Sequence, residues 1–277
     1  MNIDEFIKSS LEEDLGDGDH TSLSTIPEGK TGAAKLLVKQ EGILAGVAVA
    51  EKVFKAVDPL TDLDVFIKDG ASISPGDIVF RVNGKAASLL SAERLALNFM
   101  QRMSGIATYT HYLTSLLEGL HTKLLDTRKT TPNFRYFEKE AVRIGGGVNH
   151  RMGLYDMIMI KDNHVDFAGG IGQAIKATRQ YLDDHNKNLK IEIEVRNLKE
   201  LREVMETRGV DRIMLDNFNL VDMKTAVDLI KGQYETEASG GITEDTIRQV
   251  AETGVDFISV GALTHQVRSL DLSLKAI

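Results

Sequence analysis

LLDTRKTTPNFRYFEKEAVRIGGGVNHRMGLYDMIMIKDNHV, from Leu124 to Val165, is the most informative segment of this chain. It begins with the apolar pair Leu124-Leu125, and a second apolar run, MIMI, ends just before Lys161. Basic side chains begin where each run stops, and a glycine triplet, residues 145–147, lies between them. Between Asp126 and His164 there are seven Lys/Arg against five acids, in a chain of net charge −8. The pattern predicts two buried strands whose ends form a site for a small polyanion.

The composition narrows the class of protein. A chain of 277 residues with 42% hydrophobic and 27% charged residues can bury a sizeable core in one large or two ordinary domains. The negative charge argues against a nucleic-acid partner, and no apolar run is long enough to cross a membrane. The absence of cysteine excludes disulfides and thiolate chemistry. Because residues 1–20 lack the features of a signal peptide, we expect a cytoplasmic protein.

The second half of the chain alternates short apolar runs with amphipathic segments. Strands are predicted at Lys123–Asp126, Met157–Ile160, Lys190–Val195, Arg212–Leu215, Glu235–Ala238 and Asp256–Val260. Helices are predicted between them at Asn133–Ile144, Gly170–Asp183, Leu198–Thr207, Leu220–Lys231 and Glu244–Thr253. This alternation indicates an α/β fold with a parallel sheet, and the absence of GxGxxG after the first strand disfavours a dinucleotide-binding fold. We therefore predict an incomplete parallel βα barrel of about six strands.

The first half of the chain predicts a mixed α+β region. Its expected helices are Ile3–Leu15, Gly42–Val57 and Ser88–Gly119, and its expected strands are Ala33–Glu41, Val65–Lys68 and Ile78–Val82. Gly105 marks a break or a close helix contact in the last helix. Arg94 and Arg102 lie near one face of that helix, and the residues alone favour two solvated side chains. The acidic group Asp14, Asp17, Asp19 and His20 suggests either a metal loop or a capped turn, and we favour the turn.

Polar residues collect where the predicted barrel strands end. Ligand sites of βα barrels lie at these carboxyl ends. Lys129 and Lys161 follow the first two strands, and Glu194 and Asp216 lie at the ends of the next two. The two carboxylates could hold Mg²⁺ bridged to a diphosphate, or accept hydrogen bonds from sugar hydroxyls, or pair structurally with a lysine.

Glycine-containing loops follow the last two predicted strands. Ser239-Gly240-Gly241 precedes a helix that can start at Thr243, and Gly261 precedes a short helical segment. Glycine lets a phosphate approach backbone amides closely, and barrels often hold phosphate in their last two βα loops. Ordinary glycine turns are the alternative, but the shared location favours a phosphate site.

Several ordered motifs resemble those of the quinolinate phosphoribosyltransferase family. They are DTRKTTP (126–132), GGGVNHR (145–151), IKDNH (160–164), EIEV (192–195), LDNF (215–218), EASGGI (237–242) and SVGALTH (259–265). Upstream, EDLGDGDHTS (13–22), KQEGILAG (39–46) and ERLALNFMQRMSGIAT (93–108) extend the resemblance over nearly the whole chain. The resemblance implies an N-terminal α/β sandwich domain (1–108), a βα-barrel catalytic domain (109–265) and a C-terminal segment (266–277) that packs back on the first domain.

The resemblance also implies an activity and a site. The enzyme would transfer the phosphoribosyl group of phosphoribosyl diphosphate to quinolinate with decarboxylation, using Mg²⁺. Catalytic roles fall to Lys129, Lys161, Glu194 and Asp216, and the last two would face the ribose and the metal. Substrate binding falls to Arg128, Lys129, His150, Arg151, Lys161, Glu194, Asp216, Ser239, Gly240, Gly241 and Gly261. The family is a dimer, and Arg94 would enter the site of the partner subunit, which overrules its interpretation as a solvated residue.

The sequence departs from the family pattern at a few positions. Asn133 stands where the family usually has glycine, and asparagine tolerates the left-handed conformation that such a turn requires. Glu140 and Arg196 also differ, and we expect them to change packing or salt bridges and not the reaction. Two other functions stay possible: a paralogue acting on another aromatic acid, such as the related protein of molybdate operons, and a non-catalytic phosphometabolite-binding protein. The intact TRKTTP and NHR motifs count against the first, and the acid pair counts against the second.

Overall fold

The structure, a computed structural model, describes residues 2–277. The chain forms two compact units. The first contains residues up to His111 together with Thr131–Gly146 and Gln266–Ile277, and the second contains Tyr112–Thr130 and Gly147–His265. The segment 131–146, which the sequence assigns to the barrel, thus belongs to the first unit. No described helix has the length and apolar character needed to cross a bilayer.

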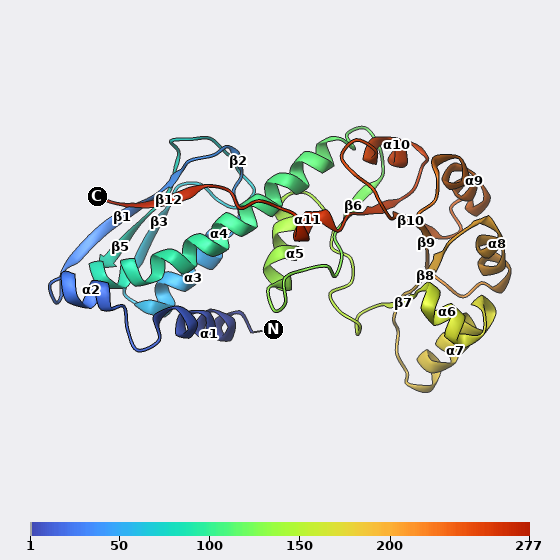
Figure 1. Ribbon diagram of the computed structural model, residues 1–277, viewed down its shortest axis with the longest axis horizontal. Helices are drawn as coiled ribbons and strands as arrows, with labels where there is room; N and C mark the ends of the chain where they lie inside the picture. Colours follow the sequence, from blue (N-terminus) through green and yellow to red (C-terminus); the bar gives the residue numbers. More distant parts are fainter. Residues whose placement is uncertain (1) are drawn as a thin grey trace. The chain divides into compact units, whose positions relative to one another are not determined.

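The first unit is built on a four-stranded antiparallel sheet in the order β12-β1-β5-β3 (Figure 1). These strands are β1 (Thr31–Val38), β3 (Asp62–Val65), β5 (Ile78–Lys85) and β12 (Leu272–Ala276), and a small pair is formed by β2 (Gly42–Ile43) and β4 (Ser72–Ile73). β12 comes from the C-terminal end of the chain and pairs with β1, with Leu36 opposite Leu274.

Helices pack apolar side chains against this sheet and against one another. They are α1 (Ile3–Leu15), α2 (His20–Thr25), α3 (Val47–Val57), α4 (Ala86–Ser115) and α5 (Arg135–Ile144). Phe6, Phe99, Phe134 and Phe137 form an aromatic cluster with ring centroids 4.8–6.1 Å apart. α5 joins this unit because its Phe137 is fully buried in that cluster. The α+β sandwich predicted for the N-terminal region is confirmed.

Several local predictions need correction. The predicted strand Val65–Lys68 begins earlier, because Asp62–Val65 pairs with β5. The predicted helix from Gly42 begins only at Val47, after Gly46 with φ 96°. α4 runs through Gly105 without a break, and a side chain there would meet the backbone of Arg268, so this glycine allows a close approach of the C-terminal segment.

Two polar details of the first unit test further predictions. Arg102 is not a solvated residue, because its guanidinium forms an ion pair of 2.8 Å with the fully buried Glu138. The acidic turn before α2 acts as a cap, because Asp19 accepts a hydrogen bond of 3.1 Å from the Ser22 N–H. Asn133 has φ 61°, so it occupies the left-handed region as predicted.

The second unit contains a six-stranded parallel sheet in the order β6-β11-β10-β9-β8-β7. Its strands are β6 (Lys123–Leu125), β7 (Ile158–Ile160), β8 (Ile191–Val195), β9 (Arg212–Asp216), β10 (Glu235–Ser239) and β11 (Phe257–Ser259). β6 and β7 are the ends of this order, so within the described residues the barrel does not close. The predicted incomplete barrel of six strands is therefore confirmed.

Helices follow the strands and cover the outer face of the sheet (Figure 1). They are α6 (Asp162–Ala168), α7 (Ile171–Asp184), α8 (Leu198–Thr207), α9 (Leu220–Ile230), α10 (Ile247–Glu252) and α11 (Ala262–His265). α6 was not predicted, and it begins directly after Lys161. α10 begins three residues later than predicted, because a turn at Thr243–Thr246 precedes it.

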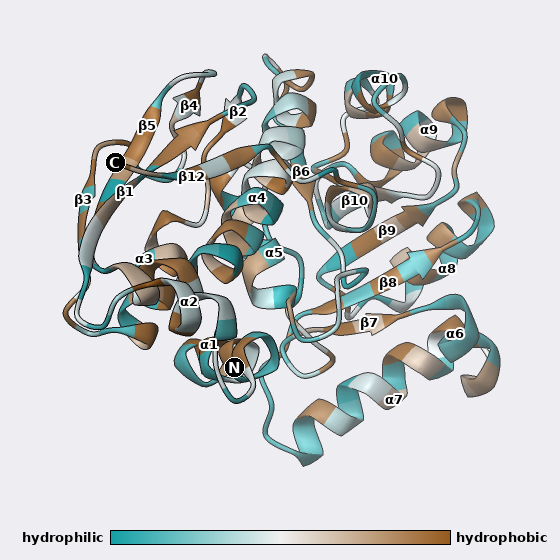
Figure 2. Cartoon of the chain, turned by 60° about the vertical axis from the view of Figure 1, so that its left-hand side comes forward, coloured by the Kyte–Doolittle hydropathy of each residue, from teal (hydrophilic) through white to brown (hydrophobic). Residues whose placement is uncertain are grey.

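Alternation along the strands places different side chains on the two faces. Ile191 and Ile193 are fully buried on the same face, while Glu192 and Glu194 are on the other. The register sets Glu192 beside Arg212, and Glu194 beside Met214. The apolar face meets the helices, and the barrel interior is therefore polar and charged. Figure 2 shows this contrast as teal residues within the brown strands β8 and β9.

Candidate active site

One pocket of about 780 Å³ in the second unit brings together the residues predicted at the strand ends. Its lining includes Arg128, Lys129, His150, Arg151, Lys161, Glu194, Asp216, Ser239, Gly240, Gly241 and Gly261. Arg94, which is exposed on α4 in the first unit, is not among the lining residues. The pocket thus gathers residues from seven separate segments of the chain at one end of the sheet, as expected for a βα barrel.

The basic side chains of the pocket differ in how firmly they are held. The guanidinium of Arg151 donates to the Met157 carbonyl over 3.0 Å and contacts the Met159 sulfur. Burial and the nearby charge of Arg128 lower the pKa of Arg151. Because the charges of Arg128 and Arg151 repel each other, the two side chains favour a doubly charged anionic ligand between them. Lys129 is exposed, and its carbonyl accepts a hydrogen bond of 2.7 Å from Thr264, which ties the β6 loop to α11.

Glu194 and Asp216 form the acidic side of the pocket, and Lys161 faces Glu194. Lys161 Nζ lies 3.5 Å from Glu194 Oε2. Burial raises the pKa of Glu194, Lys161 opposes this effect, and the charge of Asp216 adds to it. A pair of carboxylates that repel each other favours a cation, whether the Lys161 ammonium or a hard metal ion with oxygen ligands.

The glycine loops lie where a ligand would approach the backbone. Gly240 has φ 98°, and a side chain there would meet Asn217. A methyl group on Gly261 would come within 3.1 Å of Lys129 Cδ and 3.0 Å of the His265 ring. Gly240 therefore requires glycine, whereas a side chain at Gly261 would only have to displace its neighbouring side chains. Glycine at both positions keeps backbone amides accessible to an anion. α10 is too short and begins too late to contribute the helix end that we expected near Thr243.

His150 is placed differently from the other predicted cations. Its ring is buried, with Nε2 at 3.0 Å from Glu192 Oε2 and 3.3 Å from Glu237 Oε2. Its Nδ1 accepts a hydrogen bond of 2.7 Å from the Arg151 backbone N–H. Burial lowers the pKa of the His150 ring, and the two carboxylates raise it by more, to about 9. The Arg151 N–H opposes this rise, because it needs the lone pair of Nδ1 and so leaves the ring proton on Nε2. Both ring nitrogens thus face protein groups.

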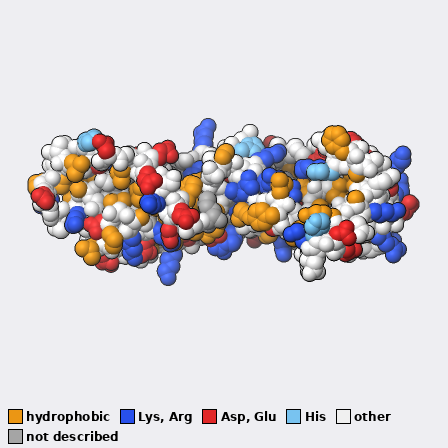
Figure 3. Space-filling model, turned by 90° about the horizontal axis from the view of Figure 1, so that it is seen from below, with side chains coloured by type: hydrophobic (Ala, Val, Ile, Leu, Met, Phe, Trp, Pro, Cys, Tyr) orange, Lys and Arg blue, Asp and Glu red, His pale blue; other side chains and the backbone are white. Residues whose placement is uncertain are grey.

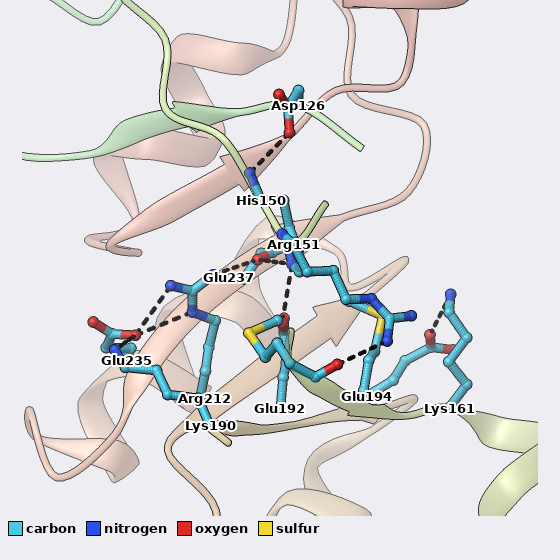
Figure 4. A network of polar contacts seen from close by, with 12 residues as sticks. Asp126, His150, Arg151, Lys161, Lys190, Glu192, Glu194, Arg212, Glu235 and Glu237 are labelled. Carbon is cyan, nitrogen blue, oxygen red and sulfur yellow. Dashed lines mark hydrogen bonds and ion pairs between the residues drawn. The ribbon is translucent and has the colours of Figure 1, made fainter. Parts of the chain in front are cut away.

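A charged layer lies beneath the pocket, inside the barrel (Figure 4). Arg212 donates to Glu237 over 3.1 Å and to Glu235 over 3.0 Å, and its guanidinium stacks 4.1 Å from the centre of the Phe257 ring. Glu192 and Glu237 are fully buried. Burial first, and then the charge of Glu237, raise the pKa of Glu192 to about 7.

Three buried acids that were not among the predicted site residues support the pocket. Asp126 accepts hydrogen bonds from the His150 N–H (2.8 Å) and from the Asn149 amide (2.6 Å). Glu192 and Glu237 hold the His150 ring from below. Part of this signal is present in the sequence, because Glu192 alternates with Ile191 and Ile193 and so lies on the same face as Glu194. What the sequence did not reveal was that the two strands face one histidine.

Two family profiles match the chain. A profile described as the quinolinate phosphoribosyl transferase N-terminal domain matches residues 19–104, and one described as the C-terminal domain of the same family matches residues 106–275. Together they cover most of both units.

Individual relatives agree with these matches. Quinolinate phosphoribosyltransferase [decarboxylating] 2b of Nicotiana tabacum is 44% identical over 99% of this chain and 82% of its own length. A probable nicotinate-nucleotide pyrophosphorylase [carboxylating] of Bacillus subtilis is 44% identical over 95% of this chain and 89% of its own. The crystal structure of NadC from Streptococcus pyogenes superposes with a TM-score of 0.94 at 39% identity, covering 99% of this chain and 97% of that one.

Proposed function

This chain belongs to the quinolinate phosphoribosyltransferase family, and from that membership we infer what its pocket does. It is a phosphoribosyltransferase that transfers the phosphoribosyl group of phosphoribosyl diphosphate to quinolinate with decarboxylation. The products are nicotinate mononucleotide, CO₂ and diphosphate, a step of NAD biosynthesis. The observation that best supports this activity here is the single pocket that gathers the cations, the acid pair and the glycine loops.

We assign the basic side of the pocket to the aromatic diacid. Quinolinate carries two carboxylates, and Arg128 and Arg151 can each bind one through a bidentate fork. The charge of Arg128 lowers the pKa of Arg151, and a dianion bound by both guanidinium groups would relieve this repulsion. The His150 ring borders the pocket, while Nε2 faces Glu192 and Nδ1 faces the Arg151 N–H.

We assign the opposite side to phosphoribosyl diphosphate. Ser239, Gly240, Gly241 and Gly261 would take the 5′-phosphate, while Glu194 and Asp216 would face the ribose. The pyridine nitrogen attacks C1 of the ribose, and the bond from C1 to the diphosphate oxygen breaks with its electron pair on the diphosphate. Lys129 and Lys161 would stabilise this leaving group. The positively charged ring nitrogen then stabilises the electron pair left on C2 when the 2-carboxylate leaves as CO₂, and C2 takes a proton from water to give nicotinate mononucleotide.

Mg²⁺ is the metal that we propose for this site. Glu194 and Asp216 offer the few carboxylate oxygens that Mg²⁺ takes from a protein when substrate oxygens and water complete its shell. Their mutual repulsion supports a cation between them. The ion would supply charge neutralisation of the diphosphate. The buried group His150, Glu192 and Glu237 also has the spacing of a metal site, but a ring proton on Nε2 leaves that nitrogen no lone pair for an ion.

We propose that the enzyme works as a homodimer in which Arg94 of one subunit completes the pocket of the other. Arg94 is exposed on α4 of the first unit, as expected for a side chain offered to a partner. In the second unit, Leu154, Tyr155 and Phe167 are 71–93% exposed, as expected for a surface that a second copy covers.

A single assay tests the proposed activity. The protein, incubated with quinolinate, phosphoribosyl diphosphate and Mg²⁺, should release CO₂ and diphosphate in equal amounts with nicotinate mononucleotide. Nicotinate in place of quinolinate should give little product, and higher turnover with nicotinate would favour another aromatic acid as the substrate. Tight binding of both substrates without CO₂ release would support a non-catalytic binding protein instead.

We also propose a division into two domains, a cytoplasmic location and small-molecule partners for this chain. The division into an N-terminal sandwich domain and a barrel domain is supported by the two compact units. The cytoplasm stays our expected location, although a tobacco relative is named as mitochondrial and an Arabidopsis relative as chloroplastic. On the face seen in Figure 3, basic side chains lie among acidic and hydrophobic ones, which fits small-molecule substrates better than a nucleic acid.

A further inference from the structure

A chain of contacts connects the buried acids of the barrel to Arg151 at the wall of the pocket. Glu192 from β8 and Glu237 from β10 approach His150 Nε2 at 3.0 and 3.3 Å. The other ring nitrogen accepts the Arg151 backbone N–H at 2.7 Å. Figure 4 shows Glu192 below the His150 ring, Glu237 to its left, and the Arg151 side chain extending to the right. The ring thus lies between two carboxylates and one backbone amide.

The hydrogen bond from the Arg151 backbone amide determines the tautomer of the His150 ring. An N–H can donate to Nδ1 only if that nitrogen keeps its lone pair, so the ring proton is on Nε2. The Nε2 proton faces the two carboxylates, which can accept it. The Arg151 amide and the two carboxylates therefore favour the same tautomer of His150. Removing either carboxylate would weaken the preference for the Nε2–H form.

Burying these carboxylates is costly, so their presence requires a reason. Within residues 2–277, neither oxygen of Glu192 has a well-aligned hydrogen-bond donor, and the side chain is fully buried. The guanidinium of Arg212 lies in the same charged layer, but its hydrogen bonds go to Glu237 and Glu235. A buried acid that is poorly satisfied reduces stability, which points to a role in the site above it.

We propose that Glu192 and Glu237 are positioning residues that hold His150 in its Nε2–H form, so that its Nδ1 fixes the backbone of Arg151 at the pocket wall. The activity part of this proposal rests on the proposed function, because Arg151 is assigned to a quinolinate carboxylate. Asp126 supports the same segment from the other side through the His150 N–H. Both side chains are fully buried, although Glu237 also borders the pocket, and their contacts with His150 connect them to Arg151.

The variants Glu192→Gln and Glu237→Gln test this role with nearly unchanged volume. Glu235→Gln is the matched control, because Glu235 lies on the same strand as Glu237 and bonds the same Arg212 but does not contact His150. In the full-length enzyme with Mg²⁺, we expect the KM for quinolinate to rise and kcat/KM to fall on the order of 10²-fold, as for a misplaced binding group. The KM for phosphoribosyl diphosphate should stay within about twofold of the wild-type value, because its proposed groups are left in place. The control should keep both values. Unchanged quinolinate kinetics in both variants, or an equal loss in Glu235→Gln, would overturn the proposal.

A second measurement does not depend on activity. ¹⁵N-histidine NMR of the wild-type protein at neutral pH should show His150 as a neutral ring protonated on Nε2, with the signal assigned by its loss in His150→Asn. A ring protonated on Nδ1 would contradict the proposal, whatever the enzyme acts on. If the wild type does not turn over quinolinate, the proposed function fails, and the same spectra of the Glu192→Gln and Glu237→Gln proteins still decide whether the glutamates set the tautomer.

Discussion

Lys161 Nζ lies 3.5 Å from Glu194 Oε2, so the lysine that follows β7 faces the acid at the end of β8. This pair joins the basic and the acidic sides of the pocket. Lys161 is about half exposed, whereas the Glu194 side chain is 8% exposed. The lysine is thus free to meet a ligand, and the carboxylate is the member whose charge state depends on the pair.

Lys161→Met should therefore change both rate and pH dependence. We expect kcat to fall on the order of 10²-fold, because one cation for the leaving diphosphate is lost. Lys161 lowers the pKa of Glu194, so its removal should raise that pKa further. Because the site uses Glu194 ionised, the acidic limb of the pH–rate profile should move to higher pH. Lys224→Met, which breaks an exposed Lys–Asp pair on α9, is the control and should leave the profile unchanged.

Glu192→Gln should alter the dependence of stability on pH. Burial and the charge of Glu237 raise the pKa of Glu192 from 4.5 to about 7, with His150 and Arg212 opposing them. The proton is held more tightly in the folded state, so this contribution to stability is complete below pH 4.5 and is lost as the pH rises through about 7. The loss amounts to at most about 3 kcal/mol.

Urea unfolding between pH 4.5 and 8, in the presence of a chelator, measures this effect. The wild type should lose stability over that range more steeply than Glu192→Gln, and the two curves should cross or converge at low pH. Parallel curves would show that Glu192 does not carry the raised pKa. Glu235→Gln, on a partly exposed acid, should follow the wild-type slope.

Gly261→Ala should weaken phosphoribosyl diphosphate binding with little loss of stability. The new methyl group would come within 3.1 Å of Lys129 Cδ and would have to displace that side chain from the loop. We expect the KM for phosphoribosyl diphosphate to rise about tenfold, equivalent to roughly 1.4 kcal/mol, and the thermal midpoint to stay nearly constant. Gly172→Ala on α7, where the nearest atom is 3.8 Å away, should leave both unchanged. An unaltered KM in Gly261→Ala would argue against phosphate binding at this loop.

Mixing two inactive variants tests the shared site. Arg94→Ala lacks the arginine offered to the partner, and Lys161→Ala lacks a lysine of its own pocket. After random subunit exchange, half of the dimers are mixed and each has one intact pocket, so about a quarter of wild-type activity should return. Native mass spectrometry would verify exchange. Mixed dimers that stay inactive would exclude the cross-subunit role of Arg94.

Much of the barrel could be predicted because its signals are local. Period-two alternation in KIEIEV separates the isoleucines from Glu192 and Glu194 without any knowledge of partners. Asp216 follows an apolar strand in the same way, and parallel strands bring all such ends to one edge. The prediction that these residues share a pocket therefore needed only strand direction and alternation.

Contacts between distant segments were decided only by the tertiary structure. The segment 131–146 has the pattern of a barrel helix, but Phe137 is buried with Phe6 and Phe99 in the first unit. His150 looked like a cation for the substrate, yet its nitrogens are engaged by Arg151 and by acids from two strands. Local patterns report which face a side chain occupies, because that depends on backbone geometry alone. Which groups meet on that face depends on strand order and register, and these are set by packing of the whole unit.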